Sequence, residues 1–485
     1  MRTNIKATFQ DIAVVVLVSI LIVSYYLRGP TAGADTGMHL SKVRIIMSSL
    51  PKIPRWNPYW YFGIPFLRIY PPLFYYSLST LGWLLSMILH HLQINEIISL
   101  AVTIYMPLIF SIGAVSTYLL AREIGLPRFG AISSALLFIT SYNLYAYLAV
   151  GSYPNIVSIL LSPLPLFLFI RGLKKKRFNY APITGLAFGF VALTYLPNAM
   201  FLTIYFLLLS ILMLMRDPSL LFIPRTKNRP PKYTLTIFKF AGLLVLSTIA
   251  SMAWWLIPFY VSIKTSSSAH TGSFIVSSVK PATPLIEELM MFSGIKGFSL
   301  TTPGICHFTL ALLGIFFATR FRRSTTTWGA YLAIITLFLY FTPWIGFVIF
   351  SLPIGRISLF FSLFGSLSGG LALSVLLQSY AKILSKYGFA RIFLPSFMGL
   401  WILLSAFSSL FLFVSPFPKA SIPSWNKDLD KKVKVGERIG VDGGYDLNLF
   451  TNAWQSGGGS VESMYMLNEY AYTFWYYIFY KKDFR

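Results

Sequence analysis

The stretch RGPTAGADTGMHLSKVRIIMSSLPKIPRWNPYWYFGIPFLRIYPPLFYY, residues 28–76, directly follows the first apolar segment of the chain. It contains one acid, Asp35, with His39 four residues later, and it is dense in Pro, Trp and basic residues. A helix in lipid does not tolerate this density, because Pro removes backbone hydrogen bonds and charges are costly at bilayer depth. A simple connector would not need it. We therefore predict a functional loop at the membrane surface with Asp35 at its centre.

The composition is that of a membrane protein. Of the 485 residues, 56% are hydrophobic and 11% are charged, whereas soluble proteins carry about 25% charged residues. Apolar runs of about 20 residues recur along the chain, which excludes a soluble enzyme with a large core. The net charge of +25 does not indicate a nucleic-acid partner, because most Lys and Arg lie in short loops that set topology. The lone Cys306 excludes an intrachain disulfide.

The pattern of apolar runs and basic loops predicts an all-α polytopic membrane protein with about eleven transmembrane helices. Placing every basic inter-span cluster in the cytoplasm puts the N-terminus inside and the C-terminus outside. Residues 73–92 are also apolar, but counting them as a span inverts every later loop, so we predict an interfacial or re-entrant helix there. The predicted spans are 11–27, 97–120, 129–150, 156–170, 181–195, 199–215, 235–258, 304–319, 327–347, 357–378 and 392–415.

This register divides the chain into a transmembrane domain, 1–415, and an extracytoplasmic segment, 416–485. Two large outer loops interrupt the domain, at 28–96 and 259–302. The polar, Gly-rich tail contains VKVGERIGV (433–441), whose alternation predicts a strand. The tail is either a small domain or the start of a larger one. We expect a multi-pass protein of the cell (plasma) membrane.

Asp35 is the acid best placed for chemistry. If a short helix begins there, Asp35 and His39 share a face at the i,i+4 spacing. Such a pair can bind a divalent metal, or the carboxylate can act as general base on a hydroxyl. The plainer alternative is an N-cap, which Asp commonly provides. On the inner side, Asp11 lies near basic residues and is interpreted as an ordinary loop charge.

Arg356 is the cation of the short outer turns, and it lies where the tenth span begins. A guanidinium at an outer-leaflet cavity suits a lipid phosphate, which it binds through two hydrogen bonds. An interfacial Arg whose head reaches toward water is the alternative. Arg44 adds positive charge to the first loop and is predicted to contact the same anion. Glu287 and Glu288 in the second large loop are either substrate contacts or solvated loop charges.

Several short motifs lie along roughly residues 10–415. They are RGPTAGADTGMH (28–39), PRWNPYWYFGIP (54–65), YPPLFYY (70–76), GSYPN (151–155), TYLPN (194–198), WWLIP (254–258) and GRISLF (355–360). These motifs resemble the multi-span proteins named 6-pyruvoyl-tetrahydropterin synthase-related membrane proteins, which are similar to GT-C glycosyltransferases. More distantly, the layout is similar to the oligosaccharyltransferase catalytic subunit, where an Asp-bearing first outer loop precedes an interfacial helix and a G-S-Y turn follows the third span.

The resemblance implies a site outside the cytoplasm that transfers a sugar from a polyprenyl-phosphate donor. The acid of the first outer loop, here Asp35, then acts as base or metal ligand. The GSYPN turn (151–155) carries no acid where the oligosaccharyltransferase has an acidic pair. A base-only mechanism, or a divalent metal (Mg²⁺ or Mn²⁺) held by Asp35 with His39, therefore fits better than an acidic two-motif metal site.

The predicted function is a membrane glycosyltransferase, of the hexosyl- or pentosyltransferase class, that uses a polyprenyl-phosphate-linked sugar. The acceptor is a glycan, lipid or protein, and membrane lipids surround the site. Asp35 and His39 act on the acceptor, and Arg356 holds the phosphate. The alternatives are a non-catalytic lipid or polysaccharide transporter and an envelope-assembly scaffold, but the concentration of charge in one outer loop favours the enzyme. The remaining predicted substrate contacts are Trp56, Asn57, Trp60 and Tyr70.

Overall fold

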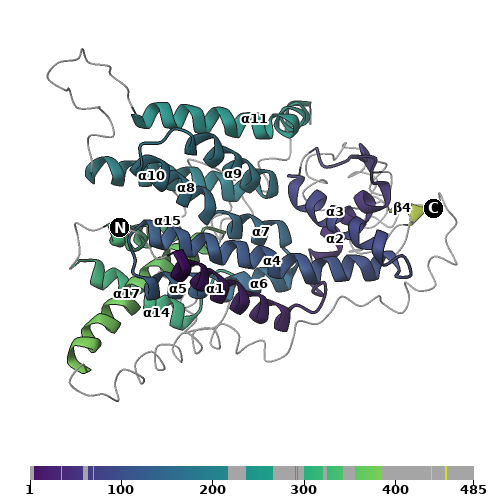
Figure 1. Ribbon diagram of the computed structural model, residues 1–485. Coiled ribbons are helices and arrows are strands. Elements are labelled where there is room, and N and C mark those ends of the chain that lie inside the picture. The colour runs from purple at the N-terminus through teal and green to yellow at the C-terminus, as the bar shows by residue number, and fades with distance from the viewer. Residues whose placement is uncertain are drawn as a thin grey trace, which may run out of the picture.

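A computed structural model shows a bundle of helices (Figure 1). It describes residues 5–33, 35–57, 64–68, 70–216, 236–265, 290, 292, 300–319, 325–341, 356–384, 438–439 and 454–455. The α-helices are α1 (Ile5–Tyr26), α2 (Thr36–Ser49), α3 (Leu73–Ile88), α4 (Ile94–Glu123), α5 (Arg128–Ile139), α6 (Tyr142–Val150), α7 (Tyr153–Leu161), α8 (Pro163–Lys174), α9 (Tyr180–Thr194), α10 (Leu196–Arg216), α11 (Thr236–Thr265), α14 (Ile305–Ala318), α15 (Trp328–Phe341) and α17 (Ile357–Leu384).

The strands in the described part of the chain are two residues long. In the first loop, β1 (Trp56–Asn57) pairs antiparallel with β2 (Ile64–Pro65). In the tail, β3 (Arg438–Ile439) pairs parallel with β4 (Trp454–Gln455). β3 lies inside the stretch 433–441 that was predicted to contain a strand.

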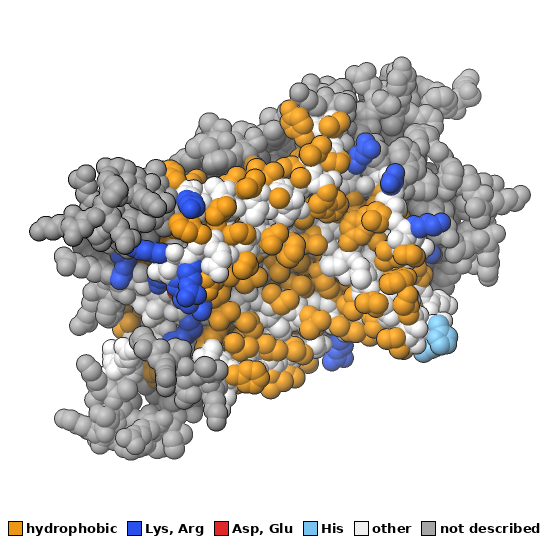
Figure 2. Space-filling model, turned by 45° about the horizontal axis from the view of Figure 1, so that its top comes forward, with side chains coloured by type: hydrophobic (Ala, Val, Ile, Leu, Met, Phe, Trp, Pro, Cys, Tyr) orange, Lys and Arg blue, Asp and Glu red, His pale blue; other side chains and the backbone are white. Residues whose placement is uncertain are grey.

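The prediction of a multi-span helical membrane protein is confirmed. Within the described residues, seven helical segments are long and apolar enough to cross a membrane, and four apolar helices are shorter. One of these helices overlaps each predicted span from 11–27 to 357–378. The predicted span 392–415 lies outside the described residues, so the number eleven stays a prediction. Figure 2 shows apolar side chains across the middle of one face, with Lys and Arg mostly toward its edges.

Two predicted spans are each made of two helices. The third span breaks between α5 and α6 at Thr140 and Ser141, and the fourth breaks at Ser162, before Pro163 opens α8. Proline is favoured in the first turn of a helix, where its missing N–H needs no partner. α6 and α7 meet at the turn around Gly151.

α3, with 16 residues, is one of the shorter apolar helices, as are α9, α14 and α15. Its length therefore does not distinguish an interfacial helix from a span. α3 packs on both α2 and α4, and α2 and α3 lie together at one end of the bundle (Figure 1). The interfacial or re-entrant helix at 73–92 stays a prediction.

Among the described long helical segments, α17 and the α5–α6 segment are the most buried, and small residues let the neighbours of α17 approach it. It packs against α14, α5 and α15. A Cβ built on Gly314 of α14 would lie 1.9 Å from the backbone oxygen of Ser368. Helices in membranes commonly associate by close packing through small residues. Lipid tails are as apolar as the helix surfaces, so no hydrophobic force drives the helices together.

Gly314→Ala is expected to destabilise the bundle, because the new Cβ must push the α17 backbone aside. Overpacking of this kind costs about 1–3 kcal/mol. Gly242→Ala is the matched control, since a Cβ at Gly242 meets nothing within 4 Å. Thermal unfolding in detergent should show a lower Tm for the first variant only. Equal Tm values for both variants would contradict the close α14–α17 contact.

The interpretation of Asp11 as a loop charge is wrong. It lies inside α1 and is buried. Its carboxylate accepts hydrogen bonds from Arg128 Nε at 2.5 Å and from the Tyr118 hydroxyl at 2.8 Å. Asp11 therefore ties α1 to α5 and α4, and a buried carboxylate needs such partners.

Candidate functional site

Asp35 stands at the start of α2, and its carboxylate does not cap that helix. The residue occupies the N-cap position without a side-chain capping hydrogen bond. Its backbone N–H instead donates to the carbonyl of Val150 at 2.9 Å, at the end of α6. The N-cap explanation of Asp35 is therefore not supported, and the half-buried carboxylate is available for another role.

The loop around Asp35 is docked tightly on the α6–α7 turn. A Cβ on Gly33 would lie 2.1 Å from the carbonyl carbon of Val150, so a side chain does not fit there. Gly151 has a φ of +88°, and a Cβ on it would lie 2.2 Å from Thr36 Oγ1. Glycine adopts this conformation without the cost that other residues incur. The first-loop motif and the GSYPN motif, far apart in sequence, thus meet at Asp35.

Arg356 precedes α17 and lies against two tyrosine rings. Its guanidinium carbon is 4.8 Å from the ring centre of Tyr195 and 5.9 Å from that of Tyr147. Tyr195 follows α9 in the TYLPN turn, and Tyr147 is in the last turn of α6. Nη1 of Arg356 is buried and has no hydrogen-bond partner among the described residues. A buried guanidinium donor of this kind suits an anionic ligand.

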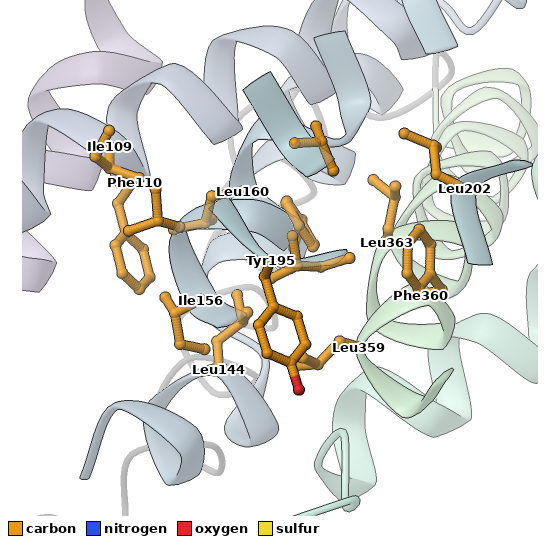
Figure 3. Close-up of a cluster of buried hydrophobic side chains, with 14 of the residues drawn as sticks. Ile109, Phe110, Leu144, Ile156, Leu160, Tyr195, Leu202, Leu359, Phe360 and Leu363 are labelled. Atoms are coloured by element: carbon orange, nitrogen blue, oxygen red, sulfur yellow. The ribbon is translucent and has the colours of Figure 1, made fainter. Parts of the chain in front are cut away.

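Tyr195 shapes this part of the site. Its ring lies in a cluster of apolar side chains, near Ile156 on one side and Leu359 on the other, and its hydroxyl points away from the cluster (Figure 3). The tight packing fixes the ring. The ring in turn gives Arg356 a fixed surface on which the cation and the aromatic face attract each other.

Asp35 and Arg356 act on each other electrostatically. Burial raises the pKa of Asp35 above its ordinary value, and the charge of Arg356 lowers it in part. The ion pairs formed within the described part of the chain do not include a direct contact between the two. Asp35 and Arg356 therefore influence each other through space, without a salt bridge between them among the described residues.

His39 lies one helical turn beyond Asp35, as the spacing predicted, and its backbone N–H donates to the Asp35 carbonyl at 3.1 Å. The ring is buried, and Nδ1 is 2.7 Å from the Tyr75 hydroxyl. Burial lowers the pKa of His39 well below its ordinary value, and the nearby Lys42 and Arg356 charges lower it further. His39 therefore links α2 to α3 through its contact with the Tyr75 hydroxyl.

Lys42, one turn further along α2, is buried over aromatic rings. Its Nζ lies 4.6 Å from the ring centre of Tyr70 and 5.3 Å from that of Tyr75. The sequence placed Tyr70 at the site but not Lys42 or Tyr75. The i,i+3 and i,i+7 spacings of Lys42 from His39 and Asp35 on a helix were a usable signal.

The other predicted residues have varied outcomes. Asn57 is buried in β1, and Arg44 is partly buried in α2. For Trp56 the structure gives the backbone, in β1. Trp60, Glu287 and Glu288 lie outside the described residues.

Sequence reasoning missed both tyrosines that lie against Arg356: Tyr195 is within the TYLPN motif that was singled out, whereas Tyr147 precedes the GSYPN motif. The two Pro-Asn motifs also meet: Asn198 Nδ2 donates to the side-chain oxygen of Asn155 at 3.0 Å and to its backbone oxygen at 3.1 Å. This contact joins the start of α10 to the start of α7. It brings the turns that carry Tyr153 and Tyr195 to the same end of the bundle.

The described donors do not fit a divalent metal. Such an ion needs several oxygen or nitrogen ligands around a site with negative charge. No group of three or more His, Cys, Asp or Glu side chains comes together among the described residues. The charge that acts on Asp35 is the cation Arg356, and Nδ1 of His39 is engaged by Tyr75. The Asp35–His39 metal pair stays a prediction.

No protein-family model matches this chain, and no curated protein matches it. The resemblance to the 6-pyruvoyl-tetrahydropterin synthase-related family therefore stays a prediction. Solved structures, in contrast, are similar over most of the chain.

The archaeal oligosaccharyltransferase AglB from Archaeoglobus fulgidus, in complex with an inhibitory peptide and a dolichol-phosphate, has a TM-score of 0.56 and 15% identity, over 92% of this chain and 64% of that one. The same enzyme with Zn and sulfate gives a TM-score of 0.52 and 14% identity, over 92% and 62%. A variant of the arabinofuranosyltransferase AftD from mycobacteria gives 0.53 and 16%, over 92% and 32%.

This chain spans less than two thirds of the length of these proteins. Identities of 14–16% establish the fold and not the activity. The chain has the GT-C-like fold of membrane glycosyltransferases, as the sequence predicted.

Proposed function

We propose that this protein is a membrane glycosyltransferase that transfers a sugar from a polyprenyl-phosphate donor to an acceptor hydroxyl. The observation that carries the proposal is that both groups gather at the last turn of α6: the N–H of the uncapped Asp35 donates to Val150, and Arg356, whose buried Nη1 has no hydrogen-bond partner among the described residues, lies against Tyr147. The fold shared with two kinds of glycosyltransferase supports it. AglB forms a complex with a dolichol-phosphate, which is a lipid-linked phosphate of the proposed donor class.

Arg356 binds the donor phosphate in this proposal. The phosphate carries the negative charge that grows when the bond to the sugar breaks, and a preorganised cation stabilises it. The rings of Tyr195 and Tyr147 keep the guanidinium in place before the donor arrives. A fixed donor group avoids the cost of reorganisation during the reaction.

Asp35 orients and deprotonates the acceptor. The acceptor oxygen attacks the anomeric carbon of the sugar, and a new C–O bond forms. The bond from that carbon to the phosphate oxygen breaks, and the phosphate leaves with the electron pair. The hydroxyl proton passes to the carboxylate of Asp35. A carboxylate whose pKa is raised by burial is a stronger base than an exposed one.

His39 has a supporting role because its ring is buried and its Nδ1 is engaged by Tyr75. We assign the walls of the sugar site to first-loop residues, and acceptors are glycans, lipids or proteins. Arg44, Glu287 and Glu288 remain proposed contacts of the donor or acceptor. The residues proposed for the walls are Trp56, Asn57, Trp60 and Tyr70.

Turnover tests the proposal. Purified protein in lipid vesicles is incubated with a panel of radiolabelled polyprenyl-phosphate sugars and with glycan, lipid and peptide acceptors. We expect a labelled product that forms with wild type and not with Asp35→Asn. Movement of intact donor across the bilayer, without product from any pair, would overturn the enzyme in favour of a transporter.

We also propose that the site faces the extracytoplasmic side of the plasma membrane, which the basic loops predict. In a Cys306→Ser background, Lys52→Cys and Lys175→Cys are suitable probes because both lysines are exposed. A membrane-impermeant thiol reagent added to intact cells should label position 52 and leave position 175 unlabelled until the cells are opened. The reverse labelling would invert the topology.

A further inference from the structure

Asp35 is held in place by the backbone around it and not by its own side chain. Its N–H donates to Val150, and the carboxylate makes no capping bond. The position of the carboxylate therefore depends on how the segment 31–36 sits on the α6–α7 turn. The groups that fix this docking control the geometry of the proposed reaction.

Two hydroxyl groups carry that docking. The backbone N–H of Thr31 donates to the Tyr153 hydroxyl at 2.9 Å, and Thr31 Oγ1 donates to the carbonyl of Leu148 at 3.0 Å. Thr31 Oγ1 also lies 3.0 Å from the Tyr153 hydroxyl and 3.2 Å from Thr36 Oγ1. A hydroxyl has one proton and two acceptor sites. Since Thr31 Oγ1 donates to Leu148, it accepts from Tyr153 and Thr36, and its capacity is fully used.

Tyr153 is itself rigidly held. It is fully buried at the start of α7, and its ring stacks on Phe74 of α3 at 6.1 Å with 10° between the planes. The hydroxyl is therefore a fixed point between the first loop and the bundle. Buried polar networks whose members are all satisfied rigidify the structure around them.

The same short segment also sets the position of Arg356. Tyr147, in the last turn of α6, lies against the guanidinium. The carbonyls of Leu148 and Val150, which follow closely, hold Thr31 and Asp35. Residues 147–153, here named the bracket, therefore contact both the Asp35 segment and Arg356.

We propose that Tyr153 is a positioning residue of the glycosyltransferase site, whose hydroxyl sets the place of Asp35 relative to Arg356 through Thr31. This inference rests on the proposed function. A misplacement of about 1 Å can lower a rate by about 100-fold. Tyr153→Phe is therefore expected to lower kcat by roughly 10- to 100-fold. KM for the donor should stay within about twofold, because the rings around Arg356 are untouched.

The positioning role of Tyr153 can also be tested without turnover, by measuring the protonation of Asp35. A hydrophobic carbodiimide labels protonated carboxyl groups, and mass spectrometry of the Asp35 peptide across pH gives the midpoint of its protonation. Burial raises the pKa of Asp35, and Arg356 is the charge that lowers it. Loss of the Tyr153 hydroxyl loosens the segment that holds Asp35 and lets water reach the carboxylate. Tyr153→Phe should therefore lower the midpoint of Asp35 protonation toward the ordinary value of about 3.9.

Three further variants control the experiment. Tyr205→Phe also removes a buried tyrosine hydroxyl, which lies 2.8 Å from Thr336 Oγ1, but at a different place in the bundle. It should change neither the midpoint nor kcat. Thr31→Val should reproduce Tyr153→Phe, and Thr31→Ser, which keeps the hydroxyl, should restore the wild-type values.

The outcomes distinguish the positioning role of Tyr153 from the proposed glycosyltransferase function. An unchanged midpoint in both Tyr153→Phe and Thr31→Val overturns the positioning role, whether or not the protein turns over sugar. An equal shift in Tyr205→Phe also overturns it, because a general loosening would then be the cause. A shifted midpoint without turnover in any protein supports the bracket and removes the proposed function.

Discussion

Asp35→Asn is expected to lower turnover by about 10²- to 10⁴-fold, the usual contribution of a general base. The amide has the shape of the carboxylate but does not accept the acceptor proton. KM for the donor should change little, because Arg356 and the tyrosines beneath it are untouched. The measurement is the initial rate of labelled product in lipid vesicles as a function of donor concentration.

Glu96→Gln is the control for this prediction. Glu96 accepts a hydrogen bond from the backbone N–H of Gln93 at 2.8 Å, in the capping box of α4. These contacts of Glu96 do not involve Asp35. Its loss removes one acid and affects helix stability alone. Similar turnover in Asp35→Asn and Glu96→Gln would remove Asp35 from the chemistry.

Arg356→Met is expected to weaken donor binding by about 2–4 kcal/mol, as removal of one partner of a buried charge pair does. This corresponds to roughly 30- to 700-fold in affinity. Arg356→Lys should lie between wild type and Arg356→Met, because Lys keeps the charge and loses the planar pair of donors. The measurement is donor binding by titration, with Arg177→Met, an exposed cation after α8, as control. Unchanged affinity in Arg356→Met would contradict the phosphate site.

The same variant predicts a change in pH dependence. The base works in its ionised form, so turnover is present above the pKa of Asp35 and is lost as pH falls through it. Burial raises this pKa and Arg356 lowers it. Without Arg356 the pKa rises further, and the acid limb of the rate profile moves to higher pH. A limb that stays in place would show that the guanidinium does not act on Asp35.

Sequence reasoning located the membrane helices because their signal is local. A run of about 20 apolar residues is long enough to span, whatever surrounds it. The predicted spans from 11–27 to 357–378 each coincide with an apolar helix. The breaks within the third and fourth were not predicted, since a broken and an unbroken helix bury the same apolar run.

Asp11 shows where charge patterns mislead. It lies between the basic start of the chain and the first apolar run, so a loop charge was the natural interpretation. Its partners Tyr118 and Arg128 are more than a hundred residues away. Such pairing comes from the packing of α1 on α4 and α5, which no local pattern encodes.

The sequence alone determined that this is a helical membrane protein. It also marked Asp35 and Arg356 as candidate site residues, because charged residues are scarce beside apolar spans and their positions can be read directly. The common placement of the two at the last turn of α6 was decided by tertiary structure. Arg356 lies against Tyr195 and Tyr147, which precede it by some 160 and 209 residues in the sequence. The Asp35 loop docks on residues 148–153 through hydroxyl and carbonyl contacts that depend on helix packing. Distances between side chains on separate helices follow from how the helices pack, and only the folded chain contains them.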